Sequence, residues 1–254
     1  MKEVEIKAMD HMLSKKKRQG IGVRIIAAVA MLMVIISMLI SSFQLVIYGD
    51  SEYGFYEREY EKYTVTEALG MKMEDVMRVT EYMMDYLIGK EDELSIVTTV
   101  EGEEQDFFNE QDRLHMADVR NLFLGGLKLR TVCLVAAVVL ILILIVTKAD
   151  WKYLIPRAYS VAVGVFLGII VLLAIAFSID FTRCFTIFHR IFFTNDLWLF
   201  DPDTDYMIRM LPEGFFSDMV IRIGLTFVVM LILLWCVFRV WRRISHENEG
   251  KHEV

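Results

Sequence analysis

The sequence predicts a mainly α membrane protein: four transmembrane helices with a small α+β extracytoplasmic head and both termini cytoplasmic. The chain of 254 residues is 56% hydrophobic and has a mean hydropathy of +0.44. A helix needs about 20 mostly apolar residues to cross the hydrocarbon core. Backbone polar groups must bond to one another in lipid, so each apolar run of this length is expected to be a helix. The four runs cover residues 24–47, 128–147, 158–180 and 217–240.

We expect the first run to be an uncleaved anchor rather than a signal peptide. Its apolar stretch is longer than the roughly 7–15 residues of a signal-peptide core, and no small-residue cleavage site follows it. The chain therefore begins with a tail, residues 1–23, that stays on one side of the membrane.

Lysine and arginine residues predict the orientation. They gather in the N-terminal tail, in the loop of residues 148–157 and in the C-terminal tail of residues 241–254. Short cytoplasmic flanks are enriched in these residues, and four crossings put all three flanks on one side. Lys128 and Arg130, at the outer end of the second run, oppose this pattern mildly. The three basic flanks are thus expected in the cytoplasm.

Two segments are then expected outside the cell membrane, residues 48–127 and 181–216. The first holds 20 acidic and 7 basic residues, a net charge of −13, whereas the whole chain has −7. So acidic a head argues against a broad basic face for nucleic acid, and we expect no nucleic-acid partner. Most of these charges are expected to be an ordinary solvated surface.

The head should combine helices with short strands. Alternating aromatic and charged residues at 53–65, and the Val/Ile/Thr-rich stretch 94–100, read as possible strands. Residues 66–88 have helical spacing and end before Gly89. Their methionines are expected to be the packing face of that helix, and an adaptable binding face is the alternative. A second helix should start at Asn109, a good N-cap, and run toward Gly125 before the second membrane run begins.

Two of the five histidines are candidates for chemistry. His11, His246 and His252 lie in the tails expected in the cytoplasm, whereas His115 and His189 are both expected outside, near the membrane surface. Packing of the four spans could bring the last two together. Imidazoles with a pKa near 6.5 suit general acid–base catalysis at about pH 7.

Asp118 lies three residues after His115, so a helix would put both on one face. Its carboxylate could hold the imidazole in one tautomer, and an ordinary surface pair is the alternative. His115, Asp118 and His189 could also supply three metal ligands, but their spacing matches no common metal motif. No other catalytic motif is present, and we expect neither a metal nor a cofactor.

Several residues around His189 are expected to support the site. Arg183 and Arg190 suit an anionic headgroup or a developing oxyanion, with snorkelling at the interface as the alternative. Trp198 fits an aromatic belt at headgroup depth. Asp201 belongs to the acidic end of the same segment. Cys184 could act as a thiol nucleophile, although a lone cysteine among phenylalanines usually packs as a small hydrophobe.

The other two cysteines, Cys133 and Cys236, lie in predicted spans. The three cysteines therefore form neither a disulfide framework nor a metal-type motif.

Four motifs carry a resemblance to a known family. FHRIFF, NDLWLFDPDTD and LPEGFF in residues 188–216, together with HMADVRNLF in residues 115–123, resemble the signature regions of the lipoprotein intramolecular transacylases, four-span bacterial membrane proteins. The resemblance implies that His115 and His189 are the catalytic residues. It implies a cell-membrane enzyme acting on the outer face.

The resemblance also implies a reaction and a substrate. The substrate would be a diacylated lipoprotein in contact with membrane lipids. The sn-2 acyl chain of its S-diacylglyceryl cysteine would move to the α-amine of that cysteine, giving a lyso-form lipoprotein. Neither the motifs nor the spacing say which histidine is the base, or whether an acyl-histidine forms. The alternative function is a non-enzymatic sensor or assembly factor that binds a partner through its acidic head.

Overall fold

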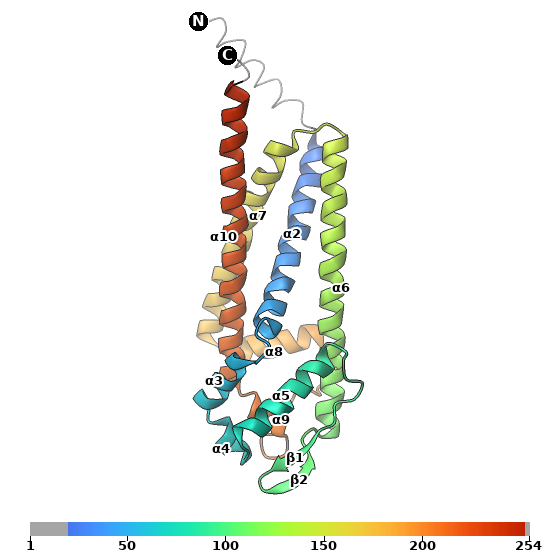
Figure 1. Cartoon of the computed structure of the whole chain (residues 1–254), viewed down its shortest axis with the longest axis vertical. Helices are drawn as coiled ribbons and strands as arrows, with labels where there is room; N and C mark the ends of the chain where they lie inside the picture. The colour runs from blue at the N-terminus through green and yellow to red at the C-terminus, as the bar shows by residue number, and fades with distance from the viewer. Residues whose placement is uncertain (1–19, 252–254) are drawn as a thin grey trace, which may run out of the picture. The chain divides into compact units, whose positions relative to one another are not determined.

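The computed structural model describes the backbone of residues 20–251 and the side chains of residues 20–244. His11, His252 and the basic cluster of residues 15–18 lie outside the described residues. Four helices of the described part are long and apolar enough to span a membrane (Figure 1). They are α2 (Ile21–Tyr48), α6 (Glu110–Val146), α7 (Trp151–Ile179) and α10 (Glu213–Lys251).

The predicted spans coincide with these helices, except that residues 147 and 180 fall one residue beyond the ends of α6 and α7, and α6, α7 and α10 extend well beyond the predicted spans. The predicted second span begins at residue 128, whereas α6 begins at Glu110 and continues through Gly125 without a break. The polar residues 110–127 and the apolar run that follows are therefore one continuous helix. His115 lies in the polar part, outside the apolar run that would cross the bilayer.

The chain divides into two compact units. The first contains residues 20–39, 130–169 and 227–251 of the described part, which are segments of the four long helices. Inside it the Tyr159 hydroxyl donates to the Leu231 carbonyl at 3.0 Å, and the rings of Trp151 and Trp241 stack at 5.4 Å. Many of its leucines, isoleucines and valines are exposed, as expected of side chains that face lipid.

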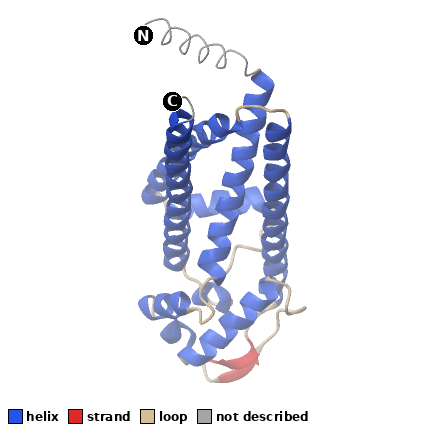
Figure 2. Ribbon diagram, turned by 45° about the horizontal axis from the view of Figure 1, so that its top comes forward, coloured by secondary structure: helices blue, strands red, loops and turns tan. Residues whose placement is uncertain are grey.

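The second unit, residues 40–129 and 170–226, contains the shorter elements. After α2 come α3 (Gly54–Lys62), α4 (Val65–Leu69) and α5 (Met73–Leu87), then an antiparallel hairpin of β1 (Val97–Val100) and β2 (Glu103–Asp106). Figure 2 shows this hairpin among helices and loops. After α7 come α8 (Phe181–Phe192) and α9 (Tyr206–Met210).

The strand expected at residues 53–65 is wrong, because this segment forms α3 and the start of α4. Tyr56, Tyr60 and Tyr63 are spaced four and three residues apart, which puts them on one face of a helix. The buried rings of Tyr56 and Tyr60 pack against Phe215 at the start of α10. The alternation with charged residues thus concealed a helical period.

The strand predicted at residues 94–100 is present as β1. The predicted helix of residues 66–88 is divided at Gly70, whose φ of +58° ends α4. Gly89, with φ +83°, follows the end of α5 as expected. Met83 and Met84 are buried, so the methionines of α5 are its packing face.

The segment between α7 and α10 is more ordered than a connecting loop. Asp180 caps α8, and its carboxylate accepts from the Arg183 backbone N–H at 2.9 Å. Residues 193–205, called the strap below, then lead to α9. Arg209 on α9 hydrogen-bonds to the Ala68 carbonyl and to Glu101, at 3.2 and 2.6 Å. This segment and the one between α2 and α6 therefore pack together within the second unit.

Candidate functional site

The first turn of α6 positions His115. Asn109 caps the helix by accepting from the Asp112 backbone N–H at 2.9 Å, while Asp112 Oδ2 accepts from the Asn109 N–H at 3.0 Å. This reciprocal pair is a capping box, which fixes where the helix begins. His115 follows one turn later and is only 5% exposed.

The last turn of α8 positions His189, which is 7% exposed. Its Nδ1 lies 2.8 Å from the carbonyl oxygen of Phe185. A carbonyl can only accept, so the proton must reside on Nδ1. In the neutral ring Nε2 then carries the lone pair, and it can accept a proton.

The structure brings His115 and His189 together. Their ring centroids are 6.0 Å apart and the ring planes are inclined by 29°. Trp198 stacks on His189 at 4.9 Å. Phe193 and Phe200 contact His115 at 5.2 and 5.3 Å. Two imidazoles from distant parts of the sequence thus share one aromatic enclosure.

This enclosure keeps both imidazoles neutral. Burial lowers the pKa of His115 to about 4; the neighbouring His189 adds to this, and Asp118 opposes it. Burial also lowers the pKa of His189, and the hydrogen bond to the Phe185 carbonyl opposes that change. At neutral pH both rings are therefore unprotonated.

Asp118 does not bond to His115, contrary to expectation. Its carboxylate accepts from the Asn195 side-chain amide at 2.9 Å, while His115 Nδ1 is buried without a partner. The backbone carbonyl of Asn195 in turn accepts from the Trp198 indole N–H at 3.0 Å. Asp118 therefore anchors the part of the strap that places Trp198 against His189.

A second set of polar contacts holds the rest of the strap. The amide of Gln111 donates to the Leu197 and Leu199 carbonyls, both at 3.0 Å. The Asn109 side chain donates to Asp205, and Asp205 accepts from the Asp201 backbone N–H at 2.7 Å. The strap is thus fastened along the first turn of α6.

The other predicted residues lie around this site in different ways. Asp201 accepts from the Asp203 backbone N–H at 3.0 Å and stabilises a turn. Arg183 and Arg190 are exposed, and in the described part of the chain neither guanidinium has a hydrogen-bond or ion-pair partner. Cys184 is half-buried with a free thiol.

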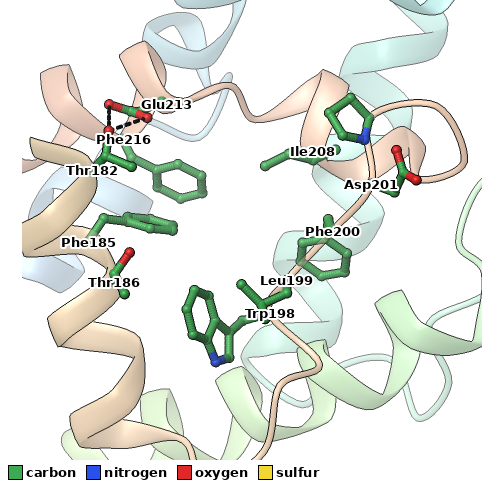
Figure 3. Close-up of a pocket in the computed structure, with 11 residues that line it drawn as sticks. Thr182, Phe185, Thr186, Trp198, Leu199, Phe200, Asp201, Ile208, Glu213 and Phe216 are labelled. Carbon is green, nitrogen blue, oxygen red and sulfur yellow. Dashed lines mark hydrogen bonds between the residues drawn. The ribbon is translucent and has the colours of Figure 1, made fainter.

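Figure 3 shows a pocket of about 490 Å³, and several of the residues that line it also contact the histidine pair. Phe185 and Trp198 line it and also contact His189, and Phe200 lines it and contacts His115. The pocket wall is aromatic with a few polar groups, including Glu213, which accepts from the Thr182 hydroxyl at 2.8 Å. The remaining lining residues are Thr186, Leu199, Asp201, Pro202, Ile208 and Phe216.

The sequence did not predict five residues that surround the site, namely Phe185, Asn195, Phe200, Glu213 and Gln111. Phe185 could have been found, because it lies four residues before His189 on a helix. Asn195, Phe200 and Gln111 act through strap contacts that carry no periodic signal, and Glu213 acts through a contact with Thr182 that is likewise distant in the sequence. Among the described residues no group of three or more His, Cys, Asp or Glu is placed to hold a metal.

A model of a protein family described as lipoprotein intramolecular transacylase Lit matches residues 28–216. No match was found among curated proteins.

Three solved structures of the transacylase Lit from Bacillus cereus share the fold. The first has 22% identity and a TM-score of 0.72, covering 90% of this chain and 100% of that one. The second, in which a histidine is replaced by arginine, has 21% identity and a TM-score of 0.68, covering 98% and 100%. The third, with alanine in place of a histidine, has 22% identity and a TM-score of 0.67, covering 90% and 97%.

Proposed function

The chain belongs to the lipoprotein intramolecular transacylase family, and we propose that it moves the sn-2 acyl chain of an S-diacylglyceryl cysteine to the α-amine of the same residue. The product is a lyso-form lipoprotein with an amide-linked chain. The observation that carries the proposal is the pair of buried, neutral imidazoles 6.0 Å apart beside an aromatic pocket.

We assign His189 as the base. The Phe185 carbonyl fixes its proton on Nδ1 and leaves Nε2 to accept. An α-amine has a pKa of about 7.7–8.0, so it must lose a proton to attack, and an imidazole can take that proton. The amine nitrogen attacks the ester carbonyl, the bond to the glycerol sn-2 oxygen breaks, and that oxygen receives a proton.

We assign His115 to pass on to the leaving oxygen the proton that His189 takes from the amine, so that both rings are neutral again at the end of the step. Donor and acceptor belong to one substrate molecule, so the site mainly has to hold the ester and the amine in attack geometry. Exchange of an ester for an amide is downhill, which removes the need for an energy source or a cofactor. The aromatic wall of the pocket suits the glycerol and the first methylenes of the lipid.

Helix α8 supports a site at the outer surface of the cell membrane. One side of it carries Phe185 and His189, which face the site, whereas Ile187 and Ile191 are 50% and 70% exposed. An amphipathic helix of this kind, with arginines nearby, lies in the headgroup region. At that depth the acyl chains stay in the bilayer while the ester reaches the histidines.

The basic residues next to the spans support cytoplasmic termini. Lys148, Lys152 and Arg157 lie between α6 and α7, and Arg242 and Arg243 lie near the end of α10. These flanks belong on the cytoplasmic side. The site, at the opposite ends of α6 and α7, then faces outward.

Mass spectrometry of lipoprotein N-terminal peptides tests the reaction. Cells that carry this chain should contain lyso-form N-acyl peptides that are absent without it. His115→Ala and His189→Ala should abolish the product while the protein still inserts, and Cys184→Ser should retain it. A diacylglyceryl form that is unchanged by the wild-type chain would refute the proposal. A product that survives both alanine variants would instead refute histidine catalysis.

A further inference from the structure

Two buried polar atoms in the site have no partner, and their residues lie one helical turn apart. Within the described chain, His115 Nδ1 and Asp112 Oδ1 are both buried without a hydrogen bond. Asp112 is 0% exposed, although it is a carboxyl group. A buried polar atom without a partner destabilises the fold, so each such atom needs an explanation.

The two atoms are chemically complementary. A carboxylate oxygen accepts, and an imidazole nitrogen can donate. Residues three apart on a helix have Cβ atoms about 5–6 Å apart, a distance that these side chains can bridge. Helical side chains generally lean toward the N-terminus of the helix, which favours Asp112 over Asp118 as the partner of His115. Asp118 is in any case bonded to Asn195.

We propose that Asp112 is the positioning residue of His115, and that its free Oδ1 accepts the Nδ1–H of His115 in the working protein. Its other oxygen already caps α6 through the Asn109 N–H. One carboxyl group would then fix both the start of the helix and the orientation of the imidazole. Each of the two histidines would have Nδ1–H held by an acceptor and Nε2 free.

The bond would also make His115 a better proton carrier. An isolated buried imidazole resists protonation, whereas a carboxylate on its far nitrogen stabilises the imidazolium. The charged groups that act on the pair come from α6, α8 and the strap, and they are Arg113, Asp118, His189 and Asp205. Acidification that protonates Asp112 would remove the carboxylate acceptor and weaken proton delivery by His115.

Histidine NMR tests the bond without reference to catalysis. The full chain, labelled with ¹⁵N-histidine in micelles, should show His115 with a protonated Nδ1 and an unprotonated Nε2. In Asp112→Asn the amide oxygen can still cap the helix, so its NH₂ faces the ring, and the tautomer should shift toward a protonated Nε2. A tautomer that is the same in both proteins would overturn the proposal, whether or not the proposed reaction is correct.

Turnover of a synthetic S-diacylglyceryl-cysteinyl peptide tests whether the bond to Asp112 makes His115 a better proton carrier. This test rests on the proposed function. Asp112→Asn should lower kcat about 10- to 100-fold with little change in KM, a part of the roughly 10²- to 10⁴-fold that general acid–base catalysis contributes. Asp112→Glu should restore most of it, because Glu at this position also forms a capping box.

The matched control is Asn109→Ala, which removes the cap from the same helix end, and with it the bond from Asn109 to Asp205, but leaves Asp112 in place. It should clearly lower the melting temperature and should change kcat much less than Asp112→Asn does. The proposal would be wrong if Asn109→Ala and Asp112→Asn lowered kcat equally and both left the pH profile of kcat unchanged. Asp112 would then act only through the helix cap. If the wild-type chain turned over no peptide, the proposed function would fail, and the NMR result would still decide the bond.

Discussion

Acidification should lower the folding stability through His115 and raise it through Asp112. In the native chain the two contributions should offset each other. The pKa of His115 is lowered from 6.5 to about 4, mainly by burial. Between those values the unfolded chain binds a proton that the folded chain does not, so stability falls as the pH falls. The pKa of Asp112 is raised from 3.8 to about 6, also mainly by burial. There the folded chain binds the extra proton, so stability rises as the pH falls.

The two contributions have similar size. About 1.4 kcal/mol per pKa unit gives at most about 3 kcal/mol for each group. They cancel over roughly pH 4–6, so the native protein should show little pH dependence from this turn of α6. A hydrogen bond between the two groups would shrink both shifts together and would preserve the cancellation.

Single substitutions should separate the two contributions. His115→Phe keeps a buried ring but removes the proton, so this variant should gain melting temperature relative to wild type on acidification from pH 6.5 to 4. Asp112→Asn keeps the cap, and it should lose melting temperature over the same range. Thermal unfolding in detergent, followed by tryptophan fluorescence, measures both. Curves for the two variants that run parallel to wild type would show that neither group titrates as the burial predicts.

Other positions give further tests. Asn195→Ala keeps the backbone carbonyl that accepts from Trp198 but releases this part of the strap from Asp118, so it should lower kcat several-fold with the fold intact, as circular dichroism and peptide turnover can check. Unchanged kcat would mean that the link between Asp118 and the strap has no role in turnover. Glu213→Gln should raise KM up to about fivefold for a substrate with a cationic amine, because Glu213 lines the pocket and an exposed ion pair contributes about 0.2–1 kcal/mol; equal KM would remove Glu213 from substrate contact. Gly70→Ala should destabilise the chain by about 1–2 kcal/mol, because its φ is +58° and a Cβ would meet the Glu101 backbone at 3.2 Å. Gly102→Ala, at φ +87° but with open space, should cost less, and equal losses would assign the effect to φ alone.

The long helices could be predicted because each carries its own signal. An apolar run of about 20 residues needs no partner to be recognised. The N-cap at Asn109 and the end of a helix before Gly89 are likewise local. Helix α3 was misread because Tyr56 and Tyr60 alternate with charged residues over a short span, where periods of 2 and 3.6 are hard to tell apart.

The site was only half predictable for a related reason. His115 and His189 stand out as residue types, but their partners depend on how the strap lies. Asp118 matched the spacing rule, yet Asn195 takes its carboxylate. In the sequence Asp112 is an ordinary acidic residue in the first turn of a helix, and only its complete burial indicates a role beside His115. Sequence spacing gives the possible partners, whereas long-range packing selects among them.

The strap joins two parts of the chain that are made at different times. His115 and the cap of α6 come from the first half of the sequence, while His189 and the strap emerge only after α7 has been made. Asn109 can bond to Asp205 only when both halves are present. A partly synthesised chain therefore holds one imidazole without its counterpart and no closed pocket. On the proposed function, the acyl-transfer centre is therefore complete only after both halves of the chain have been made.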